Sequence, residues 1–128
     1  MQGSAKNPPI ADAAPFAAIV DGIPQRLVFV DNDHVIRYLN RAAEAWYYGR
    51  RGYAELVGKS LFDCHNAESR TRVLELYERL CRGEDEVFVR VTPWNERATM
   101  VAVRDRDGRL LGYWERFEVL AAGEPSAA

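Results

Sequence analysis

Cysteine is scarce in this chain, basic residues are not in excess, and no apolar run approaches the ~20 residues of a membrane-spanning helix. Two cysteines, Cys64 and Cys81, are too few for a disulfide framework, and no secretory leader opens the chain. We therefore expect a cytoplasmic protein without membrane association. Seventeen Lys and Arg against 19 Asp and Glu give a net charge of −2, which argues against broad nucleic-acid binding.

What is present is enough apolar surface for one small core. Hydrophobic residues make up 48% of the 128 positions and aromatic residues 11%, so the composition is that of a folded protein. Proline and small residues dominate both ends of the sequence. We expect an N-terminal arm over 1–17, one domain over 18–119, and a flexible tail over 120–128.

The first half of that domain predicts a hairpin followed by short helices. Segments 26–31 and 34–40 are rich in β-forming residues, and Asn32-Asp33 between them supplies a turn. Asn40 then stands at a helix N-cap position before the helix-forming segment 41–49, which Gly49 closes.

The longest predicted helix covers 67–82 and follows a second capping residue, Asn66. Apolar residues recur along it at helical spacing, which predicts a buried stripe that includes Cys81 as an inert core residue. The stripe comprises Val73, Leu74, Tyr77, Leu80 and Cys81. On the polar face we expect three i,i+4 ion pairs. These are Glu68 with Arg72, Glu75 with Arg79, and Glu78 with Arg82.

The last third alternates with period two over 86–93, 97–105 and 109–119, which predicts three consecutive antiparallel strands. Two early strands and three late ones, with all major helices between them, form an α+β pattern. We expect one five-stranded antiparallel sheet, with the short helices and the longer helix covering one face. Such an arrangement encloses a pocket for a small-molecule ligand between sheet and helices.

The order and spacing of several short motifs resemble the PAS family of sensory modules, over roughly residues 18–119. The resemblance implies the same five-stranded fold and a role in signal transduction. The motifs are Asp31 in the first turn, Asn40 opening the first helix, Gly58-Lys59-Ser60-Leu61-Phe62-Asp63 before the long helix, and Asp107-Gly108 with Gly112 in the final hairpin.

A narrower likeness lies in Asp63-Cys64-His65-Asn66-Ala67-Glu68-Ser69. It resembles the Cys-His-Pro-Pro-x-x-Ser element of haem-binding, carbon-monoxide-sensing regulators within the family. The resemblance implies haem as a candidate cofactor, with His65 as an axial iron ligand. This sequence carries Asn66 and Ala67 in place of the two prolines, and the resemblance supplies no second axial ligand. The elements of flavin and cinnamoyl photoreceptors are absent from the sequence.

The residues themselves leave two interpretations of His65 open. Its imidazole either binds iron or a ligand, or hydrogen-bonds the start of the long helix. Met100 alternates with Ala98 and Ala102, so it either completes a His/Met pair or fills a gap in the core. Cys64 precedes a helix, which favours a reactive thiolate or metal ligand, against the commoner buried and inert thiol.

Two groups of aromatic residues are further candidates. Trp46 and Tyr48 either line the ligand pocket or pack into the core. Trp94 and Trp114 lie at strand positions that an open sheet face leaves exposed, so we expect a partner subunit or the N-terminal arm to cover them. We therefore expect a homodimer or a separate signalling partner protein.

Three classes of function remain. We favour a sensory module that binds a ligand in its pocket and signals through the face of its sheet. The alternative is a cofactor-free module for protein interaction and dimerisation. A small cleft enzyme, using Glu44 with Tyr48 or Asp63 beside His65, is the third; no catalytic motif supports it, so we expect no enzymatic activity.

Overall fold

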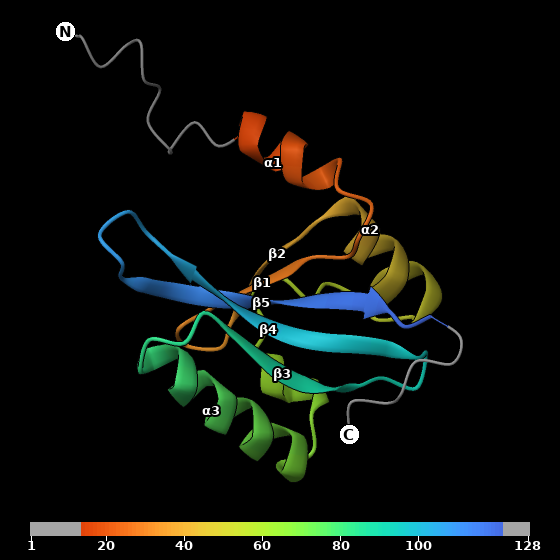
Figure 1. Cartoon of the computed structure of the whole chain (residues 1–128). Coiled ribbons are helices and arrows are strands. Elements are labelled where there is room, and N and C mark those ends of the chain that lie inside the picture. Colours follow the sequence, from red (N-terminus) through yellow and green to blue (C-terminus); the bar gives the residue numbers. More distant parts are fainter. Residues whose placement is uncertain (1–13, 122–128) are drawn as a thin grey trace, which may run out of the picture.

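The computed structural model describes residues 14–121, and the predictions for 1–13 and 122–128 lie outside the described residues. Figure 1 shows the order of the elements along the chain. They are α1 (Ala14–Asp21), β1 (Val28–Asp31), β2 (Ile36–Leu39), α2 (Arg41–Glu44), η2 (Ala45–Arg50), η3 (Leu61–Cys64), α3 (Ala67–Cys81), β3 (Glu86–Val91), β4 (Glu96–Arg104) and β5 (Leu110–Val119).

All five strands join in one antiparallel sheet of order β2-β1-β5-β4-β3, so the predicted fold class is confirmed. The early hairpin β1–β2 and the late meander β3–β4–β5 meet where β1 pairs with β5, with Phe29 opposite Trp114 and Val30 opposite Tyr113. Alternation then decides which side chains share a face. Val30 and Tyr113 point into the core, whereas Phe29 and Trp114 point to the opposite face.

Side-chain caps define where the two inner helices begin. The Asn40 side chain accepts a hydrogen bond from the Ala43 N–H at 2.9 Å, and Asn66 accepts one from the Ser69 N–H at 2.8 Å. Both predicted N-caps are confirmed. The predicted helix over 41–49 is one turn of α-helix, α2, that continues as a π-helix, η2. The wider turn is closed by the Arg51 N–H, which donates to the Trp46 carbonyl oxygen.

The apolar stripe of α3 differs from the predicted one. Its buried residues are Val73, Leu76 and Leu80, which follow the i, i+3, i+7 spacing of one helix face. Cys81 lies one residue past Leu80, about 100° further round the helix, and is exposed. The prediction of Cys81 as a core residue is therefore wrong.

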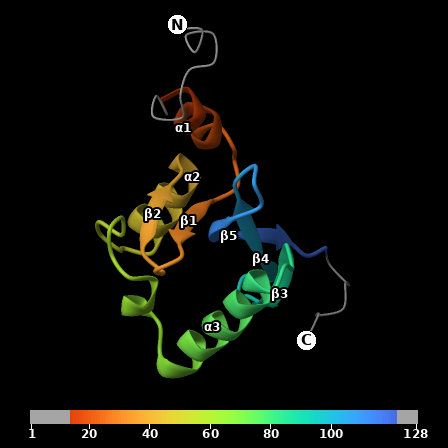
Figure 2. The same cartoon turned by 90° about the vertical axis from the view of Figure 1, so that its left-hand side faces the viewer.

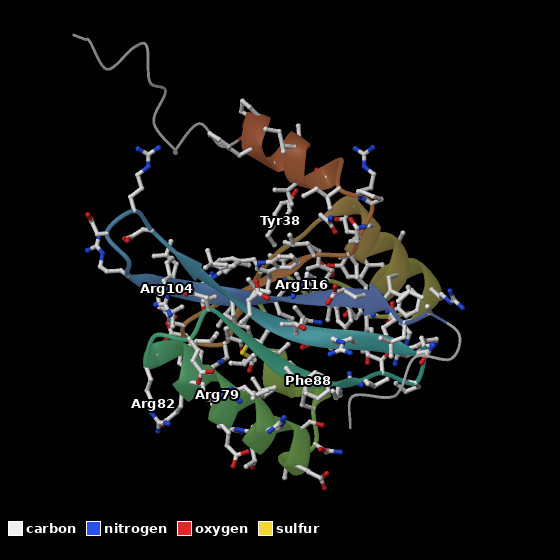
Figure 3. The ribbon with its side chains drawn as sticks, viewed as in Figure 1. Tyr38, Arg79, Arg82, Phe88, Arg104 and Arg116 are labelled. Atoms are coloured by element: carbon white, nitrogen blue, oxygen red, sulfur yellow. The ribbon has the colours of Figure 1, made fainter. Side chains whose placement is uncertain are left out.

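The polar face of α3 also differs in part from the prediction. Arg82 pairs with Glu78 at 2.9 Å, as expected. Arg79 pairs instead with Glu84, just beyond the helix, through two hydrogen bonds of 2.8 Å. Arg72 reaches across to β3, where it lies 3.4 Å from the Val89 carbonyl oxygen. Figure 3 shows Arg79 and Arg82 on the outer side of α3.

The two ends of the domain are more ordered than the sequence predicts. The helix α1 begins inside the predicted arm, and the Tyr38 hydroxyl on β2 donates to Asp21 at its end, at 2.6 Å (Figure 3). Leu120, assigned to the tail, is buried, and its N–H donates to the Asn95 carbonyl oxygen at 3.0 Å. Within 14–121 no helix is both long and apolar enough to cross a membrane.

The helices α1 and α3 lie on opposite sides of the sheet (Figures 1 and 2). The core forms between one face of the sheet and the segment from α2 to α3, with α3 packed along β3. Its buried side chains are Val30, Ile36, Leu39, Ala43, Val73, Leu76, Leu80, Val87, Val89, Ala98, Met100 and Tyr113.

Candidate functional site: the cavity between sheet and helices

A cavity of about 980 Å³ lies between the sheet face and the helical segment. Strands β1, β3 and β5 contribute one wall, and η2, η3 and the first half of α3 contribute the other. Drug-sized ligands occupy pockets of ~300–1,000 Å³, so this cavity has the size of a ligand site.

His65 is at the helical wall of this cavity, between η3 and α3. The ring is half-buried and stands edge-on to Phe62, with ring centroids 6.4 Å apart. Its Nδ1–H donates to the Leu61 carbonyl oxygen at 2.8 Å. This bond places a proton on Nδ1 and orients the ring.

Of the other predicted site residues, some line the cavity and others do not. Trp46 lines the cavity. Tyr48 is not among the lining residues; its hydroxyl accepts a hydrogen bond from the Leu56 N–H at 3.0 Å. Met100 faces the same side of the sheet, but it is 0% exposed and covered by its neighbours. The Cys64 side chain lies outside the described part of the chain.

An ion pair that the sequence analysis missed lies beside the cavity, and one of its partners, Arg26, lines it. The Arg26 guanidinium donates to both carboxylate oxygens of Glu96, at 2.8 and 3.0 Å. It also lies 3.7 Å from the Phe117 ring centroid and 4.5 Å from that of Trp46. Seventy residues separate the two partners, so no local pattern indicates the pair.

Trp94 does not lie on an open sheet face. It stands in the β3–β4 turn against Trp46, edge-on with centroids 5.2 Å apart, and it lines the cavity. The Arg51 guanidinium lies 5.0 Å from the Trp94 ring centroid. These three side chains form an aromatic and cationic rim, in which cation–π contacts hold Arg51 in place.

Tyr47, the neighbour of Trp46, also lines the cavity, as does Glu115, which the sequence analysis did not single out. Burial raises the pKa of the Glu115 carboxyl, while Arg90 and Arg26 act in the opposite direction. Burial also raises the pKa of Tyr47, and the Glu115 charge adds to that effect. The sequence signal for Glu115 is its place two residues from both Tyr113 and Phe117, because residues two apart on a strand lie on the same face.

A smaller hollow of about 500 Å³ lies beside α3 and includes His34, Tyr77 and Cys81. His34 Nδ1 is 2.8 Å from the Tyr113 hydroxyl, and burial lowers the pKa of His34. Burial, together with Cys81, raises the pKa of Tyr77 to about 12. These groups form a packed network without an open acid–base pair.

The acid–base pairs proposed for a cleft enzyme are not assembled in the cavity. Glu44 and Asp63 are both exposed, and neither is among the lining residues. Residues 14–121 contain no group of three His, Cys, Asp or Glu side chains placed to bind a metal ion.

A family model described as the PAS fold matches residues 20–122. The chain belongs to the PAS family. The five-stranded sheet with helices between its second and third strands is therefore the PAS fold, and its general role is that of a sensory and signalling module. No curated protein matches the sequence.

Several solved structures resemble this domain. A C-terminal domain from Streptococcus mutans is 24% identical over 81% of each chain, with a TM-score of 0.67. The Aer2 receptor from Vibrio cholerae, described as a dual PAS-heme oxygen sensor, is 25% identical over 80% of this chain and 99% of its own, with a TM-score of 0.56. A sensory box sensor histidine kinase from Vibrio cholerae is 16% identical over 91% and 98%, with a TM-score of 0.57.

Proposed function

We propose that this PAS domain is a sensor that binds a small ligand in the cavity between its sheet and helices, and passes the signal to a partner protein or a second copy. The observation that carries the proposal is the cavity itself, about 980 Å³ of space lined by both apolar and charged side chains. Ligand sites are concave, with a mostly apolar lining and a few polar groups that orient the ligand, and this cavity has that character.

Haem bound through His65 is the most specific form of this proposal. The ring lines the cavity, and the hydrogen bond from its Nδ1–H to the Leu61 carbonyl oxygen orients it. Arg51, Arg72 and Arg90 also line the cavity, and guanidinium groups bind carboxylates such as haem propionates. The 25% identity to a PAS-heme oxygen sensor supports the same cofactor.

The residues therefore fit haem on one side of the iron. His65 would hold the iron, the arginines would bind the propionates, and the bound haem would supply gas binding or electron transfer. Met100 does not line the cavity, so it offers no second ligand there. The role of Cys64 in this site stays a prediction.

The test is an absorption spectrum of the protein from cells supplied with a haem precursor. We expect a Soret band that shifts on reduction and with carbon monoxide, that is lost in His65→Ala, and that returns when imidazole is added to that variant. His34→Asn is the matched control, since His34 is the chain's other histidine and Asn tolerates its φ of 63°. A colourless protein that takes up no added haem would exclude the haem form and leave an organic ligand.

A second candidate function is dimerisation without any cofactor. The helix α1 has no buried residue, and its Phe16 and Ile19 side chains are 50% and 65% exposed. Exposed apolar side chains on one short helix are typical of a surface that a partner covers. We propose a second copy of this chain as that partner.

Sedimentation of the wild-type chain and of Phe16→Asp/Ile19→Asp tests this second proposal. We expect a dimer that becomes a monomer in the double variant, while the near-UV spectrum of the domain stays unchanged. Val57→Asp is the control, because Val57 is 54% exposed but lies outside α1. A monomeric wild-type chain would exclude self-association.

A further inference from the structure

Glu115 is a carboxylate on the inner face of the sheet. It lies on β5 between Tyr113 and Phe117, opposite Met100 of β4, and it lines the large cavity. The alternate residues of the strand, Trp114 and Arg116, occupy the other face. Half-buried, Glu115 keeps part of its surface open to the cavity.

Within the described residues, the Glu115 carboxylate makes no hydrogen bond or ion pair. Other acidic groups of the sheet are matched: Glu96 pairs with Arg26, and Glu86 pairs with Arg116. Placing a carboxylate away from water without a partner is unfavourable, and mutation to an apolar residue would relieve that cost. A carboxylate at such a position is suited to a partner that enters the cavity.

The nearest cations of the chain do not supply that partner. Arg26 donates to both Glu96 oxygens and is wedged between the rings of Trp46 and Phe117. Arg90, on β3, is exposed and forms no ion pair with Glu115 in the described structure. Both lower the pKa of Glu115 from a distance, but burial outweighs them.

The surroundings of Glu115 favour a positively charged group. Tyr47, Tyr113, Phe117 and Trp46 contribute aromatic rings to the same cavity, and aromatic faces attract cations. The exposed lining residues on α3 include acidic side chains, Glu68 and Glu75, and a basic one, Arg72. They therefore favour neither a positive nor a negative ligand.

We propose that Glu115 is the specificity-determining contact of the cavity and that it faces a positively charged centre of the ligand. That centre is either the ferric iron of a haem or the ammonium group of an aromatic amine. The inference rests on the proposed ligand-binding role of the cavity, and two experimental arms distinguish the two sources.

The first arm uses the haem-free protein and two probes with the same indole body, tryptamine and indole-3-propionate. We expect tryptamine to bind the wild-type chain and to bind Glu115→Gln more weakly by about tenfold. Glu115→Asp keeps the charge and retains tryptamine binding, whereas indole-3-propionate is not weakened by Glu115→Gln. Backbone NMR shifts at lining residues locate the bound probe, and circular dichroism confirms that each variant is folded.

The second arm uses protein reconstituted with haem and measures its reduction potential. A carboxylate in the cavity that holds the haem would stabilise the ferric form, so Glu115→Gln is expected to raise the potential and Glu115→Asp to change it less. If Glu115→Gln weakens tryptamine binding but leaves the reduction potential unchanged, the ligand is an organic amine. If it changes only the reduction potential, the ligand is haem.

Ligand binding without any dependence on Glu115 would overturn the inference and leave the sensor proposal standing. If neither haem nor either indole enters the cavity, the inference fails together with the haem form of the sensor proposal.

Discussion

Glu96 at the start of β4 holds Arg26, in the segment before β1, through both oxygens of its carboxylate. Each side chain is only 11% exposed. The Thr92 hydroxyl also donates to Glu96, at 3.2 Å, and the Thr92 N–H donates to the Glu96 carbonyl oxygen at 2.8 Å. The pair thus ties the entry of the domain to the β3–β4 turn at the rim of the cavity.

Removing one partner of this ion pair is expected to destabilise the fold. Glu96→Gln leaves the Arg26 guanidinium buried without its counter-charge, which costs about 3 kcal/mol of unfolding free energy. Glu86→Gln is the control, because Glu86 and Arg116 pair at 2.9 Å with side chains 53% and 33% exposed, and such pairs contribute less than about 1 kcal/mol. Urea unfolding measures both, and equal losses would contradict the prediction.

The same pair predicts a pH dependence of stability. The hydrogen bond from Arg26 lowers the pKa of Glu96 below its ordinary 4.5, so the folded protein binds fewer protons than the unfolded chain in this range. The stabilisation is therefore fully present above pH 4.5 and is lost as pH falls through the lowered folded pKa. Unfolding free energies of wild type and Glu96→Gln should converge below pH 4.5, and a constant difference would refute this assignment.

The sheet and caps follow from local patterns, which is why the sequence predicts them. Asn40 and Asn66 bind the N–H groups of helices that begin directly after them, and the period of two in the last third needs only neighbouring residues. The predicted stripe of α3 includes Leu74 and Cys81, which are exposed, and omits Leu76, which is buried. Residues adjacent on a helix fit the periodicity almost equally well, so the pattern alone does not choose between them.

The site is only partly predictable, because its groups come together through the tertiary fold. His65 is found from its place before a helix, and it does line the cavity. Arg26 and Glu96 are brought together by the pairing of β1 with β5 and of β5 with β4, which the sequence does not register. The sequence does not distinguish Glu115 from a solvent-exposed strand residue, because it does not show that Tyr113 and Phe117 face inward.

Asn40 is expected to contribute far more than an ordinary cap. It is 0% exposed, and its Oδ1 accepts from the N–H groups of Leu27 and Ala43 at 2.9 Å. Its Nδ2 donates to carbonyl oxygens of Val20, at 3.1 Å, and Gln25, at 2.9 Å. Asn40→Ala leaves these groups without a partner and should cost about 3 kcal/mol or more.

Asn66→Ala is the matched control for Asn40. Asn66 is an exposed N-cap whose side chain accepts from one N–H, that of Ser69, so its loss should cost about 1 kcal/mol. Chemical denaturation of the two variants measures the difference. Similar losses would show that the contacts of Asn40 with the segment before β1 add nothing.

Gly112 on β5 marks the closest approach between β5 and β1. Its φ is +153°, and a Cβ built there would lie 2.1 Å from the Val30 carbonyl oxygen, a backbone atom that cannot move aside without breaking the β1–β5 pairing. Gly112→Ala should therefore destabilise the domain by several kcal/mol, about 3 or more, or prevent folding. Gly49→Ala is the control, because Gly49 has open space at its Cβ and lies in the helical segment η2, where alanine is stabilising by about 0.5–1 kcal/mol. Thermal unfolding of both variants checks the contrast, and a Gly112→Ala protein as stable as wild type would show that β1 and β5 are further apart than this pairing requires.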